Sequence, residues 1–123
     1  MTIANALAMV DSTCPNTRTL GEKLAWISQL AGQVLEFMRG FEGNLSCDGS
    51  TLPYREEDMN RELLVPFPYD AVYVHFICAM ICYASGEFSK YENALVQHNY
   101  TMQQFRIQYA RTHMPIQPRK RVL

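Results

Sequence analysis

The sequence predicts an all-α protein, a small bundle of about four helices with a long irregular loop over residues 41–68 and an extended C-terminal arm. Apolar residues recur every three or four positions between residues 20 and 41 and again between 88 and 109, which places them on one face of a helix. Between these stripes, residues 71–84 are apolar on nearly every side, as in a helix at the centre of a bundle. The 123 residues suffice for one domain with its own core.

The N-terminal part predicts two helices. A short first helix is expected over Thr2–Val10, and a turn over Ser12–Arg18, where a proline and an asparagine interrupt the pattern. Thr19 and Glu22 predict a capping box that starts the second helix, and Gly40 is expected to end it in the left-handed conformation. Its apolar stripe consists of Leu20, Leu24, Ile27, Ala31, Val34, Met38 and Phe41.

The segment Phe41–Pro68 predicts an irregular loop, since glycines and prolines recur along it. Asp48-Gly49 is typical of a hairpin turn, and Glu56, Glu57 and Asp58 favour a single helical turn because negative charge suits a helix start. Loops of this length are usually functional or ordered by a partner. The alternative is an inert loop packed on the helices.

The C-terminal half predicts a helical hairpin. Asp70 is the expected N-cap of a helix that ends near Ala84, and Ser85-Gly86 is the expected reversal. A fourth helix over about Glu87–Thr112 would be roughly 39 Å long, which exceeds the needs of a compact domain, so part of it should project or pack on a neighbour. Its stripe consists of Phe88, Tyr91, Leu95, His98, Met102, Phe105 and Tyr109.

The final segment, Pro115–Leu123, predicts an extended arm because two of its residues are prolines. We treat residues 1–114 as the helical domain and 115–123 as the arm. The basic cluster Arg119, Lys120 and Arg121 could grip phosphate, but three charges alone bind nucleic acid weakly and no aromatic residue is interleaved for stacking. Ile116, Val122 and Leu123 provide apolar anchors, which favour a protein partner.

Charge is unevenly distributed along the chain. Residues 1–70 hold five Lys or Arg against ten Asp or Glu, a balance of −5, and residues 71–123 hold six against two, a balance of +4. Such a chain could pack head-to-tail with copies of itself, or the two halves could simply carry different solvated faces. The overall net charge of −1 gives no bulk attraction to nucleic acid or membrane.

The cysteine and hydropathy patterns indicate synthesis in the cytosol with reduced thiols. Cys14, Cys47, Cys78 and Cys82 do not have the spacing of a small secreted scaffold, and no signal peptide is recognised. The most apolar run, Ala71–Ala84, is too short to span a bilayer, which takes about 20 residues. We therefore expect no membrane association.

Catalytic and metal chemistry find little support. His75, Cys78 and Cys82 share one side of a predicted helix, but a structural zinc site needs four ligands and buried cysteine is common as a small apolar residue. His98 lies on an apolar stripe without a partnered nucleophile or carboxylate, so a structural role is expected. We predict that the protein is not an enzyme and uses no cofactor or metal.

An ordered set of residues between Leu63 and Pro115 resembles the head–tail connector (adaptor) proteins of tailed bacteriophages and prophages. A leucine pair before a proline, a Pro-Tyr-Asp start of an aromatic-rich helix, a Gly-Glu reversal and a final Arg-Thr-His-x-Pro follow in the family's order. The matching residues are Leu63, Leu64, Val65, Pro66, Pro68, Tyr69, Asp70, Tyr73, Gly86, Glu87, Tyr91, Asn93, Asn99, Arg111, Thr112, His113 and Pro115. The chain departs from the pattern at Cys82, where an aspartate is expected, and at His98, where a phenylalanine is expected.

The resemblance implies a helical protein of the virion neck, assembled in the host cytoplasm. It would form a ring under the portal protein, following the portal's twelvefold symmetry, and extend the channel through which DNA passes without sequence-specific binding. A tail-side neck or tail-completion protein would be the next partner. The portal-binding arm would use Ile116, Arg119, Lys120, Arg121, Val122 and Leu123, and contacts with neighbouring subunits or the neck would use Tyr54, Glu56, Glu57, Asp58, Arg106 and Arg111.

An alternative function is a small helical phage protein that binds nucleic acid through the basic tail. Salt-dependent DNA binding that is lost when residues 119–121 are deleted would distinguish it from the connector. Deleting Pro115–Leu123 is expected to leave the helices folded, because the segment contributes little to the predicted core.

Overall fold

The computed structural model describes residues 1–41 and 52–115. They form four α-helices, α1 (Ile3–Thr13), α2 (Leu20–Met38), α3 (Ala71–Ala84) and α4 (Phe88–Thr112), and one short 3-10 turn, η1 (Glu56–Asp58). The described ranges contain no strand, only two isolated antiparallel bridges. The all-α prediction is confirmed, and so is the helical turn at residues 56–58. The predicted hairpin at Asp48-Gly49 and the arm residues 116–123 lie outside the described residues.

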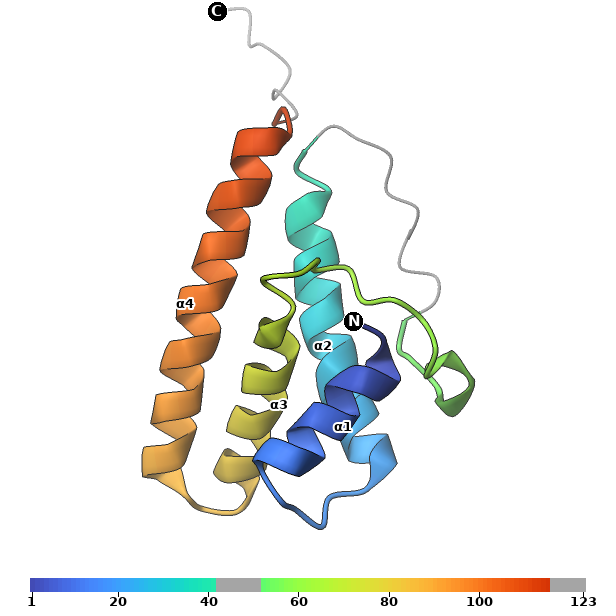
Figure 1. Ribbon diagram of the computed structural model, residues 1–123, viewed down its shortest axis with the longest axis vertical. Helices are drawn as coiled ribbons and strands as arrows, with labels where there is room; N and C mark the ends of the chain where they lie inside the picture. Colours follow the sequence, from blue (N-terminus) through green and yellow to red (C-terminus); the bar gives the residue numbers. More distant parts are fainter. Residues whose placement is uncertain (42–51, 116–123) are drawn as a thin grey trace, which may run out of the picture.

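Helix α3 is the central element, as its composition predicted. It packs against α1, α2 and α4 (Figure 1), and Val72, Tyr73 and Ile77 are fully buried. The loop before it crosses the bundle, and there the backbone N–H of Val65 donates to the Tyr73 hydroxyl at 3.0 Å. Burial, the main cause, raises the pKa of this phenol, so it stays a neutral hydrogen-bonding group. Tyr73 therefore fastens the loop to the core.

Helix α1 runs further than expected, to Thr13 rather than Val10. The helix ends at Thr13 because Pro15 disfavours helical geometry at the residue directly before it, Cys14, and not at earlier residues. Carbonyl groups of the loop cover the start of the helix: Ile3 N–H donates to Arg61 O at 3.1 Å, and Ala4 N–H to Met59 O at 2.9 Å. Two backbone donors that a helix leaves free at its start are thus satisfied by residues far along the chain.

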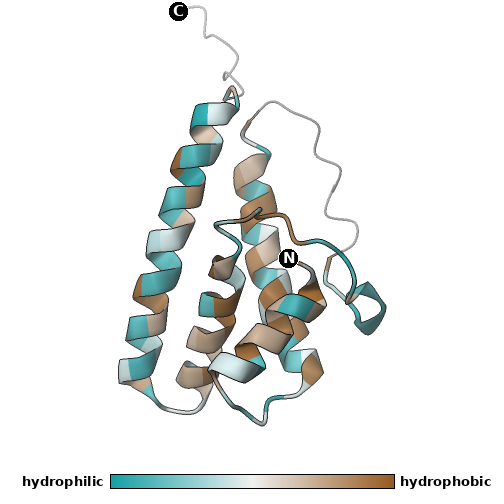
Figure 2. Ribbon diagram, viewed as in Figure 1, coloured by the Kyte–Doolittle hydropathy of each residue, from teal (hydrophilic) through white to brown (hydrophobic). Residues whose placement is uncertain are grey.

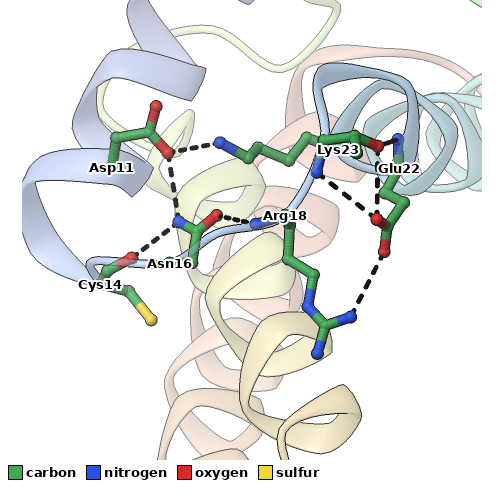
Figure 3. A network of polar contacts seen from close by, with 7 residues as sticks. Asp11, Cys14, Asn16, Arg18, Glu22 and Lys23 are labelled. Carbon is green, nitrogen blue, oxygen red and sulfur yellow. Dashed lines mark hydrogen bonds and ion pairs between the residues drawn. The ribbon is translucent and has the colours of Figure 1, made fainter.

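A polar network fixes the turn between α1 and α2 (Figure 3). Lys23, almost buried, donates to Asp11 at 2.7 Å, and the Asn16 amide donates to both Asp11 at 3.2 Å and the Cys14 carbonyl at 2.9 Å. The hydrogen bond from Lys23 is the main cause that holds the pKa of Asp11 below its usual value. The capping box of α2 is confirmed, since the Glu22 N–H donates to the Thr19 hydroxyl at 3.1 Å.

Two predicted helix ends are wrong in detail. Gly40 does not adopt a left-handed conformation, because the chain leaves α2 in a right-handed turn in which Gly40 N–H donates to Phe37 O and Phe41 N–H to Met38 O, both at 3.1 Å. Asp70 stands at the N-cap position of α3 but its side chain caps nothing. Its backbone is already helical, and its carboxylate lies 3.7 Å from the Met1 ammonium instead.

The reversal between α3 and α4 matches the prediction. Gly86 is the one described residue with a left-handed backbone, at φ 77°. Its N–H donates to Tyr83 O at 3.1 Å, and the Glu87 N–H donates to Cys82 O at 2.9 Å, so the last carbonyls of α3 have partners.

Helix α4 is more polar than α3 (Figure 2), and only part of its predicted stripe is buried. His98, Met102 and Phe105 are buried, whereas Phe88 is 58% exposed. The far half of α4 extends past the start of α3 (Figure 1), and there Phe105 and Tyr109 contact the Phe37 ring of α2. Among the described helices, none is long and apolar enough to cross a membrane.

Candidate functional site

The candidate functional site is the end of the molecule where α2 and α4 both terminate. Phe41 and Pro115 pair there in an isolated antiparallel bridge. The long loop begins at Phe41 and the C-terminal arm at Pro115, so the two segments that the sequence pattern predicted to bind partners start at one place (Figure 1). Residues so far apart in sequence give no local signal of such a pairing.

A group of aromatic rings, here called the aromatic end cluster, builds this place. Its contacts connect α2 to α4: ring centroids lie 5.8 Å apart for Phe37 and Tyr109, 5.2 Å for Phe41 and Tyr109, and 6.2 Å for Phe37 and Phe105. Tyr69, just before α3, reaches the Phe105 ring at 6.3 Å. Tilted and edge-on rings at these separations attract one another beyond their area burial. The cluster therefore gives the two departing segments a rigid base.

The end of α4 carries the Thr-His pair of the Arg-Thr-His-x-Pro sequence. The His113 ring stacks on Tyr109 with centroids 3.8 Å apart, and its Nδ1 lies 3.0 Å from the Tyr109 carbonyl. The same Nδ1 lies 2.9 Å from the Thr112 hydroxyl. The Thr112 hydroxyl donates to the Gln108 carbonyl at 3.1 Å. The Thr112 hydroxyl thus satisfies a carbonyl that a helix end leaves free, and both side chains lie just before Pro115.

A small apolar cavity of about 230 Å³ opens beside the cluster. It is walled by residues of α2, of the loop before α3 and of α4, namely Met38, Leu64, Pro66, Tyr69, Phe105, Gln108, Tyr109, Thr112 and His113. Next to it, Phe67 is 84% exposed. The size and the apolar lining of this cavity would suit an apolar side chain.

A second, polar hollow of about 420 Å³ lies between α2 and α4. Its lining consists of Gln33, His98, Asn99, Met102, Gln103 and Arg106, none of which is acidic. His98 Nδ1 lies 3.2 Å from the Val72 carbonyl and donates to it, so this ring ties α4 to α3. Burial is the main cause that lowers the pKa of His98, which favours the neutral ring.

The predicted contact residues on α4 lie at or near the candidate site. The Arg106 guanidinium stands over the Phe37 ring, 5.6 Å from its centroid, and remains exposed. Arg111 is exposed in the last turn of α4, where a positive charge also suits the helix dipole.

The predicted contact residues in the loop lie elsewhere: the 3-10 turn η1 lies near the start of α1 (Figure 1), and Tyr54 packs on α2. Tyr54 is 7% exposed and belongs to the core, and its N–H donates to Ser28 of α2 at 2.9 Å; this burial argues against a contact role. The Asp58 carboxylate accepts a hydrogen bond from Arg61 Nε at 2.8 Å. Glu56 and Glu57 are exposed. The structure therefore does not bring the six predicted contact residues together, and Ile116, Arg119, Lys120, Arg121, Val122 and Leu123 lie outside the described residues.

The side chains considered for metal binding do not form a metal site. Over residues 1–41 and 52–115, no group of three or more His, Cys, Asp or Glu side chains is arranged to hold an ion. Cys78 and Cys82 are buried in α3, and burial lowers the pKa of the half-buried His75.

Comparisons with protein-family models, with curated proteins and with solved structures found no match to this chain.

Proposed function

We propose that this protein is a structural component of a phage neck, a head–tail connector that forms a ring between the portal and the next neck or tail component. The observation that carries the proposal is the ordered set of residues from Leu63 to Pro115 that resembles such connectors. Its mechanism is assembly rather than catalysis. The ring extends the DNA channel, and DNA passes through it without sequence-specific contacts.

The placement of the resembling residues supports this proposal. Pro66 and Tyr69 form the turn that leads into α3, where Tyr69 N–H donates to Pro66 O at 2.9 Å. Gly86 makes the left-handed reversal. Thr112 is the last residue of α4, and His113 follows it with its Nδ1 3.0 Å from the Tyr109 carbonyl. These parts of the pattern stand where the backbone changes direction, whereas other matching residues, such as Tyr73 and Asn99, lie within α3 and α4.

The loop and the arm both start at the same end of the bundle, and this also supports the proposal. A protein that joins two different components needs segments that reach out from a rigid body, and the aromatic end cluster provides such a base for both. The arm is the proposed portal contact, through Arg119, Lys120 and Arg121 and the apolar anchors around them.

Contacts between subunits in the proposed ring would be head-to-tail, since a heterologous contact closes into a ring when its rotation closes. The exposed carboxylates Glu56 and Glu57 lie on one part of the molecule, and the exposed Arg106 and Arg111 lie on α4. We propose that these opposite charges meet between neighbours, in a ring of twelve that copies the portal's symmetry.

Electron microscopy of the protein mixed with its portal tests the proposal. The expected result is a ring of added density on the tail-facing side of the portal, with one subunit per portal subunit. A portal that stays bare over a wide range of protein concentrations would contradict it.

The nucleic-acid alternative is tested on the isolated protein. Titration with a fluorescent duplex at several salt concentrations, repeated with Arg119, Lys120 and Arg121 all changed to Ala, should show no binding at physiological salt for either protein. Tight binding that falls steeply with salt and is lost in the variant would favour the nucleic-acid function instead.

A further inference from the structure

Helix α4 carries a second apolar stripe, on the face opposite its buried one. Val96, Tyr100 and Ile107 follow one another at steps of four and seven, so they share one side of the helix. They are 63%, 64% and 39% exposed, whereas His98 and Phe105 on the other side are buried in the bundle. These three exposed residues are here called the α4 ridge. An exposed apolar stripe at this spacing is typical of a helix that packs on a further partner.

Helix α2 has a groove of a matching kind on its outward face. The groove is a mostly apolar hollow of about 400 Å³, bordered by Ala25, Ser28, Gln29 and Gly32 of α2 and by Leu52 and Pro53 of the loop. It is open at Gly32, because a Cβ added there would meet nothing within 4 Å. The groove can therefore accept side chains from a helix that lies along α2.

The ridge and the groove face different sides of the molecule. Both helices pack on α3, and α4 lies on one side of the bundle while the loop from residue 52 lies on the other (Figure 1). On α2, Ala25 and Gln29 are exposed on the side opposite the fully buried Ile27 and Val34, so the groove faces outward. One molecule cannot place its own ridge in its own groove, so the occupant we consider is a second copy.

The positions of the ridge and the groove along the helices match. Helices α2 and α4 run in the same direction (Figure 1), and the rings of Phe37 and Phe105 meet between them. Both helices rise about 1.5 Å per residue, so Gly32 and Tyr100, each five residues earlier, stand at about the same level. Copies that are related by rotation about an axis along the helices keep their levels. The Tyr100 ring of one copy therefore comes level with the open Gly32 position of the next.

Charge complementarity favours the same pairing of copies. Glu36 follows the groove one turn beyond Gly32, and its side chain is 80% exposed although the Arg39 guanidinium lies 3.7 Å from it. On α4, Ile107 stands near the level of Glu36, and the exposed Arg111 follows one turn later. A guanidinium at this place can reach the Glu36 carboxylate of a neighbouring copy and form a charge-assisted hydrogen bond.

We propose that the α4 ridge of one copy packs into the α2 groove of the next, with Tyr100 over Gly32 and Arg111 beside Glu36. The contact is heterologous, because each copy uses two different surfaces, so it can repeat around a ring. The ring rests on the proposed function, whereas the contact between two copies needs no portal. Three ridge side chains cover less than the roughly 800 Å² per partner of a stable interface, so two isolated copies bind weakly.

Sedimentation velocity of the full chain without a portal, up to millimolar concentration, tests the contact. The average mass of the unaltered protein should rise with concentration. Gly32→Leu fills the groove and Tyr100→Asp places a charge on the ridge, so either variant alone should stay monomeric. Mixed in equal amounts, the two variants should form a one-to-one complex that grows no further, because each retains the surface that the other has lost.

The charged pair gives a second measurement. Glu36→Arg should weaken the self-association, and Glu36→Arg combined with Arg111→Glu should restore it. Gln108→Asp, an exposed change on α4 away from the ridge, is the matched control for Tyr100→Asp and should associate as the unaltered protein does. Circular dichroism of each variant checks its fold, and Gly32→Leu should keep α2 helical because leucine favours a helix more than glycine does.

The outcomes separate this contact from the proposed function. An unaltered protein that stays monomeric, a single variant that still self-associates, or a mixture without a complex would overturn the contact. A complete ring of the Tyr100→Asp protein on the portal would also overturn it, and would leave the connector function standing. Self-association as expected with a portal that stays bare would support the contact and contradict the connector function.

Discussion

At the scale of single residues, Phe105 is where α4 joins the rest of the molecule. Its ring is 2% exposed and contacts the rings of Phe37 on α2 and Tyr69 before α3, besides that of Tyr109 one turn further along α4. The Phe105→Ala variant should lose about 3–5 kcal/mol of the free energy of unfolding, because it removes these contacts and leaves a cavity. Urea titration followed by circular dichroism measures the loss. Tyr100→Ala, at a side chain that is 64% exposed on the same helix, is the matched control and should change stability by less than about 0.5 kcal/mol.

His98 makes stability depend on pH. Its folded-state pKa lies below the ordinary value because the ring is buried, so the unfolded chain binds the proton first as the pH falls. Its contribution is fully present above the unfolded pKa, about 6.5, and is lost as the pH falls from there through the folded pKa. His75, whose pKa burial also lowers, acts in the same direction.

The variant His98→Phe tests this at the position where the resemblance leads us to expect phenylalanine. Between pH 7.5 and pH 5.5, its free energy of unfolding should fall less than that of the unaltered protein. The fall that remains should come mainly from protonation of His75. Urea titrations at the two pH values provide the comparison. An equal fall in both proteins would show that His98 is protonated in the folded state without penalty.

At the scale of the elements, two glycines with opposite requirements offer a paired test. Gly86 has φ 77°, and an added Cβ would meet nothing within 4 Å, so its requirement is purely conformational. Gly86→Ala should therefore lower the free energy of unfolding by about 1 kcal/mol, the penalty of a left-handed alanine. Gly32, inside α2 and equally open, should give the reverse: Gly32→Ala should gain up to about 1 kcal/mol.

Thermal unfolding of both glycine variants in one buffer measures the contrast. A neutral Gly86→Ala would mean that the α3–α4 turn can relax to an ordinary conformation. A destabilising Gly32→Ala would mean that α2 is strained at this position in a way that its helical backbone does not suggest.

The elements themselves were predictable where the signal is local. The Thr19–Glu22 capping box, the central apolar α3 and the Gly86 reversal depend on neighbouring residues, and all three are confirmed. The errors at Gly40 and Asp70 have a common cause, which is that a residue type permits a cap without requiring it. At both places backbone hydrogen bonds of ordinary turns satisfy the chain, and the side chain of Asp70 points to the Met1 ammonium instead.

The candidate site was less predictable, because it depends on pairings between distant segments. The sequence indicated that the 41–68 loop and the arm matter, but not that Phe41 and Pro115 meet. Nor did it show that Tyr54 would be buried on α2 rather than exposed, since an isolated tyrosine in a polar stretch carries no periodicity. The aromatic residues Phe37, Phe41 and Tyr109 near the two helix ends were the one hint of a shared cluster.

At the scale of the whole molecule, the bundle and the arm have different roles in the proposed function, and a truncation should separate folding of the bundle from attachment through the arm. A chain that ends at Pro115 keeps the bridge to Phe41 and the aromatic end cluster, so its circular dichroism and thermal midpoint should match those of the full chain. It lacks Arg119, Lys120 and Arg121 with their apolar neighbours, so under the proposed function it should no longer attach to portal-bearing heads.

Changing only the three basic residues to Ala shows how much of the attachment is electrostatic: a partial loss that grows with salt is expected, because Ile116, Val122 and Leu123 remain. Heads that take up the truncated chain as fully as the intact one would place the portal contact on the bundle and not on the arm.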